Sequence, residues 1–167
     1  MATFTWFDGE VPNGTKITQV YGLVFTPDGR MLIIGKDKKD RVEYSLIGGT
    51  PEDFDVDKEA TLRRELLEEA NTALGNEIHM VGYQLVDEEN GIPPYAQVRM
   101  MAMIDSIGPS QPDPDNGQTY QRILTTPDRV IELLKWGTTG EKQVKAAVQM
   151  AKQYFGISSH LDKEEIV

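Results

Sequence analysis

The segment Arg64-Glu65-Leu66-Leu67-Glu68-Glu69-Ala70-Asn71 follows the pair Gly48-Gly49 after a stretch long enough for a loop and the first turns of a helix. Residues three and four positions apart share one face of an α-helix. A helix here places the carboxylates of Glu65, Glu68 and Glu69 on one side. Like charges repel at this spacing, and a hard divalent cation such as Mg²⁺ takes oxygen ligands. The segment therefore indicates a metal site, with an ordinary solvated acidic helix as the alternative.

The apolar residues of this segment favour a helix packed on a core. They recur at helical spacing, at Leu62, Leu66, Ala70 and Ala73. We predict a helix from about residue 56 to residue 71, with Asp55 or Asp57 as the N-cap. Asn71 can adopt the left-handed conformation that ends a helix.

Gly48-Gly49, Asp55, Arg64-Glu65-Leu66 and Glu68-Glu69 together resemble the signature box of the Nudix hydrolases, over about residues 48–72. The resemblance implies an α/β fold, a Nudix-type α/β/α sandwich with a mixed sheet. It implies a pyrophosphohydrolase that depends on Mg²⁺, for which Mn²⁺ can substitute. The substrate class is a nucleoside diphosphate linked to another group, such as a nucleoside triphosphate or ADP-ribose.

The resemblance also assigns roles to residues. The implied catalytic residues are Arg64, Glu65, Glu68 and Glu69. The three glutamates are the expected metal ligands, with a backbone carbonyl near Gly48 or Gly49. Arg64 lies four residues before Glu68 and is expected to orient that carboxylate. Arg63 is expected to be solvated or to face the phosphates.

Nudix enzymes often use one further acid outside the box, as a ligand or a general base. Asp113 and Asp115, in the long loop of residues 106–118, are the candidates that we select. Residues 87–89 in the preceding loop are further candidates. For each of these acids a solvated loop position is the alternative.

Three features depart from the box. Asp55 stands where the family has glutamate, and eight residues separate it from Arg64 where the family has seven. Asn71 and Thr72 replace a glycine and an aliphatic residue. The shorter acid leaves its pairing with Arg64 open, with Asp57 and Glu59 as alternative partners. These changes motivate a second hypothesis, a non-catalytic sensor of nucleotides or ADP-ribose on the same scaffold.

The composition of the chain argues against several kinds of partner and of active site. The formal net charge is −10 and no dense basic patch is present, which argues against nucleic acid as a partner. Cysteine is absent, so thiolate metal sites and cysteine nucleophiles are excluded. The sequence shows no signal peptide and no apolar run near the ~20 residues that cross a bilayer, so we expect a cytoplasmic protein without membrane contact. The family resemblance makes a homodimer possible.

The rest of the chain reads as strands followed by helices. Expected strands cover residues 3–7, 15–25, 31–35, 43–47, 79–86, 95–104 and 119–125, and expected helices cover 128–134 and 140–155. The turn Pro27-Asp28-Gly29 predicts a hairpin over residues 15–36. Length predicts one domain, residues 1–156, followed by a loosely ordered tail, residues 157–167.

Overall fold

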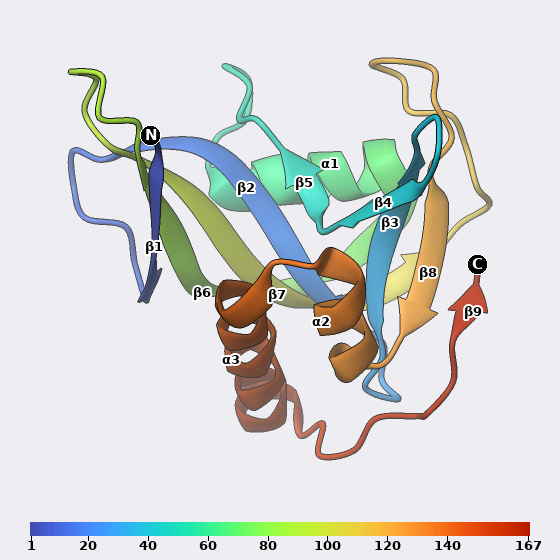
Figure 1. Ribbon diagram of the computed structural model, residues 1–167. Helices are drawn as coiled ribbons and strands as arrows, with labels where there is room; N and C mark the ends of the chain where they lie inside the picture. The colour runs from blue at the N-terminus through green and yellow to red at the C-terminus, as the bar shows by residue number, and fades with distance from the viewer.

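The computed structural model describes all residues from 1 to 167. A mixed β-sheet lies between helices on both of its faces (Figure 1). Helix α1 (Lys58–Ala70) covers one face, and helices α2 (Pro127–Leu134) and α3 (Gly137–Phe155) cover the other. The predicted α/β sandwich with a mixed sheet is confirmed.

The sheet is antiparallel except for one parallel pair in its middle. Its strands are β1 (Thr3–Asp8), β2 (Lys16–Phe25), β3 (Met31–Asp37), β4 (Val42–Ser45), β5 (Ile47–Gly49), β6 (Thr72–Asp87), β7 (Tyr95–Ile107), β8 (Gln121–Thr125) and β9 (Glu165–Ile166). The main path runs β1-β6-β7-β2-β3-β8-β9, with β4 on β3 and β5 on β2. The parallel pair is β2 with β7.

The turn of the predicted hairpin is present, but its two strands do not pair along their length as predicted. Strands β2 and β3 pair only through Phe25 and Met31. Beyond that point β2 pairs with β5 and β7, whereas β3 pairs with β4 and β8. The expected strand over residues 43–47 is divided in the same region, because Leu46 separates β4 from β5. The turn depends on neighbouring residues and could therefore be predicted. The partner strands of β2 and β3 come from distant parts of the sequence and could not.

Each face of the sheet has its own apolar core. Leu62, Leu66 and Ala70 of α1 pack on one face, and Val144, Ala147 and Ala151 of α3 pack on the other. The helical stripe that we extended to Ala73 is wrong at that residue. Asn71 takes φ 45°, which ends the helix, and the chain enters β6 at Thr72.

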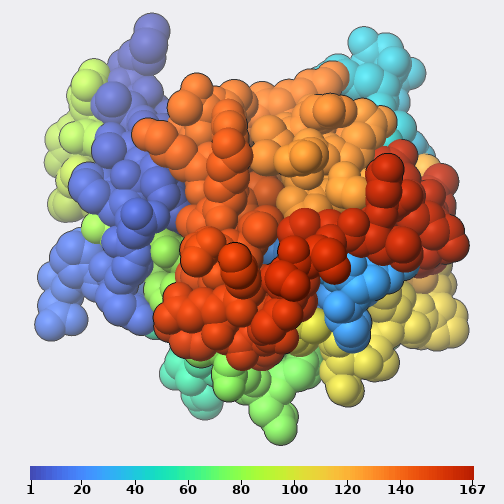
Figure 2. Space-filling model, turned by 90° about the horizontal axis from the view of Figure 1, so that it is seen from below, coloured from blue at the N-terminus to red at the C-terminus, as the bar shows by residue number.

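Residues 157–167 are not the loosely ordered tail that we expected. Residues Glu165 and Ile166 form β9 on β8, and the Nη1 of Arg30 lies 2.7 Å from the Glu165 Oε1. Leu161 N donates to the Asp28 carbonyl at 2.9 Å. Figure 2 shows this segment, in red, lying over the blue turn between β2 and β3. Strand β8 lies about forty positions earlier and Arg30 lies 135 positions earlier, so a local pattern did not show these partners.

None of the helices combines the length and the apolar character that a bilayer span requires.

Candidate active site

Helix α1 is fixed at both ends by side chains. The Asp57 carboxylate caps its start by accepting from Ala60 N at 2.8 Å, so the helix begins at Lys58 and not near residue 56. Asn71 closes its end in the left-handed conformation, as predicted. The Asn71 Nδ2 also donates to the Pro109 carbonyl at 2.9 Å. The residue that replaces the family's glycine therefore attaches the helix end to the long loop.

Asp55 is the partner of Arg64, which answers the question left open by the sequence. The Arg64 Nε and Nη2 donate to the two Asp55 oxygens at 3.1 and 2.9 Å. The side chains are 15% and 5% exposed, so the pair is largely shielded from water. The hydrogen bonds from Arg64 hold the pKa of the Asp55 carboxyl well below its usual range. Asp57 serves as the helix cap instead.

Arg64 also joins two of the acids on α1. Its Nη1 donates to the Glu65 Oε1 at 3.0 Å and to the Glu68 Oε2 at 3.1 Å. The predicted contact between Arg64 and Glu68 is present, and the contact with Glu65 adds to it. Arg63 differs from its expected position, because its guanidinium binds the carbonyls of residues 74–76 at the start of β6.

Glu69 faces the glycine pair. Gly48 N donates to the Glu69 Oε1 at 2.9 Å, and Lys36 Nζ lies 3.9 Å from the Glu69 Oε2. Burial raises the pKa of Glu69 to about 7. A Cβ added to Gly49 would overlap the Glu65 carboxylate, so a larger residue here would displace that carboxylate from its present position. Lys36 was missed, because nothing in the sequence relates the end of β3 to α1.

The long loop brings both of its candidate acids to α1. Glu68, Asp113 and Asp115 offer carboxylate oxygens that all lie within 4.8 Å of one another. Asp113 is only 5% exposed, and its carboxylate accepts from Asp115 N at 2.9 Å. Glu65 and Glu69 do not belong to this compact group. The predicted triplet is thus divided, with Glu68 at the loop acids and Glu69 at Gly48.

The donor set fits a hard divalent cation. It consists of carboxylates, and burial raises the pKa values of Glu65 and Glu68. Neighbouring carboxylates raise them further, since Asp113 acts on both. Arg64 and Lys36 are the cations paired with this group, so the acids outnumber the bases.

A cavity of about 460 Å³ lies on the α3 side of the sheet, whereas α1 covers the opposite face. It is lined by Phe4, Gln19, Tyr21, Ser45, Leu46, Gln84, Gln97, Arg99, Trp136, Thr139 and Gln143. Tyr21 forms part of its wall and is in register with Gly48, whose amide binds Glu69. The Arg99 guanidinium lies 4.9 Å from the Tyr21 ring centre and 5.4 Å from that of Trp136. Sequence reasoning missed Arg99, although a charged residue inside the apolar run of β7 was a usable signal.

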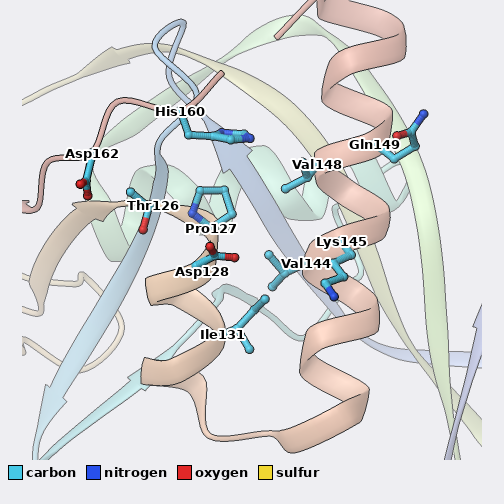
Figure 3. Close-up of a pocket in the computed structure, with 10 residues that line it drawn as sticks. All are labelled: Thr126, Pro127, Asp128, Ile131, Val144, Lys145, Val148, Gln149, His160 and Asp162. Carbon is cyan, nitrogen blue, oxygen red and sulfur yellow. The ribbon is translucent and has the colours of Figure 1, made fainter. Parts of the chain in front are cut away.

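A second cavity, of about 450 Å³, lies between α2, α3 and the C-terminal segment (Figure 3). Pro127 and Ile131 line it from α2, Val144 and Val148 from α3, and His160 from the C-terminal segment. No residue of α1 lines it, so it is separate from the acidic site.

No protein-family model matches the sequence, and no curated protein matches it. Solved structures do resemble the fold. A pyrophosphohydrolase of Bacillus subtilis, BsRppH, superposes with a TM-score of 0.67 at 16% identity, over 89% of this chain and 92% of that one. A NUDIX hydrolase from Nitrosomonas europaea gives 0.61 at 13% identity, over 88% and 94% of the two chains.

A third similar structure is the NUDIX domain of Shewanella oneidensis NrtR complexed with ADP ribose. It gives a TM-score of 0.59 at 14% identity, over 81% of this chain and 88% of that one. At such identities the likeness establishes the fold and leaves activity open. The fold that the sequence predicted is confirmed.

Proposed function

We propose that this chain, which has the fold of the Nudix hydrolases, is a divalent-metal-dependent pyrophosphohydrolase acting on a nucleoside diphosphate derivative. The observation that carries the proposal is the set of carboxylates on α1, which Asp113 and Asp115 extend from the long loop. A divalent cation would reduce the repulsion among these carboxylates, and such an ion also assists attack on a diphosphate.

Each acid has a proposed role. Glu65, Glu68 and Glu69 would hold Mg²⁺ or Mn²⁺, with a backbone carbonyl of Gly48 or Gly49 nearby. When bound, the ion would neutralise phosphoryl oxygens and lower the pKa of a coordinated water. Arg64 orients Glu65 and Glu68 through its Nη1. Its other side is anchored on Asp55, so it acts as a positioning residue.

Asp113 and Asp115 are the proposed proton acceptors. Their carboxylates lie beside Glu68, where an attacking water would be placed. Asp113 is held by the backbone of its own loop, and Gly117 N donates to its carbonyl at 2.7 Å. A general base must be within hydrogen-bond reach of the water, and this loop geometry supports that reach.

The test is a hydrolysis screen over nucleoside triphosphates, ADP-ribose, dinucleoside polyphosphates and sugar nucleotides, with Mg²⁺ or Mn²⁺. Glu69→Gln is expected to lower turnover by at least about a hundredfold, because a ligand of the ion loses its charge. Glu132→Gln is the matched control, since Glu132 is 66% exposed on α2. Turnover in Glu69→Gln equal to that of the wild type would remove this site assignment.

A non-catalytic sensor is the second candidate, motivated by the departures at Asp55 and Asn71, and ADP-ribose is its candidate ligand because the similar NrtR domain is complexed with ADP ribose. It predicts tight binding of ADP-ribose without product after hours of incubation with Mg²⁺. The retained pair between Asp55 and Arg64 favours the enzyme, because the positioning device of the site is intact. A cytoplasmic location and a homodimer remain predictions.

A further inference from the structure

Arg99 is a buried cation without an acidic partner. Arg99 is 3% exposed, and its guanidinium forms no salt bridge with a carboxylate. The lining of its cavity contains no aspartate or glutamate. Burial lowers the pKa of Arg99 to about 10, so the group remains protonated at neutral pH. A buried charge is costly unless it is compensated, and here a ligand can supply hydrogen-bond acceptors.

The hydrogen bonds around Arg99 occupy acceptors, including the carbonyls of Gln97 and Val98 at 3.4 and 3.5 Å from the Arg99 Nη1, and leave the amide nitrogens of neighbouring glutamines free. The Arg99 Nε donates to the Gln143 Oε1 at 2.9 Å, and its Nη2 donates to the Gln84 Oε1 at 3.4 Å. The Tyr21 hydroxyl donates to the Gln19 Oε1 at 3.0 Å. The amide oxygens of these glutamines are thus engaged, whereas their amide nitrogens donate to no protein group. The cavity therefore presents mainly donors to whatever enters it.

Gln143 shows this imbalance most clearly. It is 1% exposed, and its Nε2 is a buried donor without a partner. Buried polar groups are nearly always hydrogen-bonded, so an unpaired donor in a cavity wall indicates a missing acceptor. Its oxygen is fixed by Arg99, which sets the direction of the amide.

The rest of the lining fits a flat group. The rings of Tyr21 and Trp136 both contact the Arg99 guanidinium. Aromatic rings and guanidinium groups can stack on nucleobases. Arginine pairs with the keto oxygen of a base as a donor, whereas an amino group would face donors. We propose that this cavity binds the base of the substrate and selects keto bases, such as hypoxanthine, guanine and uracil, over the amino bases adenine and cytosine.

The proposal deepens the proposed function and rests on it for the position of the diphosphate. Tyr21 is paired with Gly48, and the Gly48 amide binds Glu69. A base beside Tyr21 would therefore place its phosphates toward the carboxylates of α1. Base selection itself needs neither the ion nor catalysis, which allows the two ideas to be tested separately.

The test uses nucleosides that differ mainly in a keto or an amino group. Inosine is compared with adenosine, and uridine with cytidine, without phosphate and in the presence of a chelator. Binding is followed by NMR through the Trp136 indole and the Gln143 amide. The keto nucleoside of each pair is expected to bind at least about tenfold more tightly. Equal or reversed affinities would overturn the proposal.

Two other outcomes would also overturn it. One is that no nucleoside perturbs the cavity, and the other is that inorganic phosphate alone binds at Arg99. The proposed function has a separate readout, because hydrolysis of diphosphates can succeed with no preference among bases. Conversely, keto selectivity without any hydrolysis would remove the enzyme and leave this proposal standing.

A variant provides the second measurement. Gln143→Glu replaces the unpaired donor with an acceptor and is expected to reduce the keto preference at least about tenfold. Gln97→Glu makes the same exchange at a half-buried position, if the first variant does not fold. Gln149→Glu is the control, since Gln149 lies on α3 in the other cavity (Figure 3). An unchanged preference in folded Gln143→Glu would contradict the proposal.

Discussion

Arg64 makes five hydrogen bonds, and together they decide how the acidic side of α1 is held. Two go to Asp55, one to the Thr50 carbonyl, and one each to Glu65 and Glu68. The planar guanidinium can satisfy all of these because it has five N–H groups in a fixed geometry. One residue thus connects the glycine-rich strand end, the loop and the helix.

Asp55→Ala is expected to lower the free energy of unfolding by about 3 kcal/mol, because Arg64 loses two of its five hydrogen bonds and a largely buried ion pair. Urea unfolding monitored by circular dichroism measures the loss. Asp57→Ala is the comparison, since removal of a helix N-cap costs about 1 kcal/mol. A loss in Asp55→Ala no larger than in Asp57→Ala would show that the pair is not a main support of the loop.

The pKa of Glu69, raised to about 7 from 4.5, predicts a pH-dependent response to magnesium. Between these values the folded chain holds the proton more tightly than the unfolded chain, so this group's contribution to stability decreases as the pH rises. The ion needs the deprotonated carboxylate. The rise in melting temperature caused by Mg²⁺ should therefore be larger at pH 8 than at pH 6. Glu69→Gln should lose most of that difference, and an equal rise at both pH values would count against the assignment.

The residues that the sequence predicted share one property, which is local spacing. The contact between Arg64 and Glu68 and the left-handed Asn71 follow from positions along a single helix. Lys36 and Arg99 contact Glu69 of α1 and Gln143 of α3, which are distant in the sequence, so no pattern near them indicates a partner. The sequence suggested Asp113 as a further acid of the site, but only the folded loop brings it close to Glu68.

Among the elements, α1 and the long loop behave as a connected pair. Gly108 N donates to the Asn71 carbonyl at 2.9 Å, and the Asn71 amide reaches Pro109. The helix end therefore sets where the loop starts, and the loop carries Asp113 to Glu68. This connection uses the side chain that glycine, the family's residue at this position, lacks.

Asn71→Gly separates the two roles of this residue. Glycine keeps the left-handed helix end but removes the bond to Pro109, so amide hydrogen exchange should become faster in residues 108–120 while α1 stays protected. Asn71→Ala should instead destabilise the helix end by about 1 kcal/mol, since alanine disfavours this conformation. Unchanged exchange in the loop of Asn71→Gly would show that the side-chain bond does not order it.

Element types were more predictable than element partners. Most of the strands and helices expected from alternation and helical spacing are present with boundaries moved by a few residues. The strand expected to begin at residue 79 begins at Thr72, the strand expected over residues 43–47 is divided, and β9 was not expected. The pairing of β2 with β7 and the break at Leu46 were not predicted. Pairing depends on which surfaces meet after the chain folds, and the sequence of one strand does not encode the identity of its neighbour.

At the scale of the whole molecule, the C-terminal segment connects the sheet edge to the site. The Arg122 Nη1 donates to the carbonyls of Ala70 and Gly108, each at 2.7 Å. Its Nε donates to the Val167 carbonyl at 3.2 Å. The same guanidinium thus contacts the end of α1, the start of the long loop and the last segment.

Removal of residues 158–167 is expected to lower the free energy of unfolding by about 2 kcal/mol, because Arg30 and Arg122 lose partners. The bonds from Arg122 to Ala70 and Gly108 remain, so the folded, shortened chain should retain the activity of the full chain. Urea unfolding and the hydrolysis assay measure the two quantities. Lys163→Ala is the control for a surface change, since Lys163 is 59% exposed. Full stability after removal would show that β9 contributes nothing.

The parallel pairing of β2 and β7 also affects the order in which parts of the protein can fold. Lys16 lies beside Tyr95 in this pair, and the cavity also needs Trp136, which precedes α3, and Gln143 of α3. Bringing such distant segments together is slow, because a long loop must close first. The acidic helix and Asp55 are close neighbours in the chain and need no such closure. On the ribosome, all of α1 is therefore synthesised well before Trp136 and Gln143, which complete the cavity that would select a base.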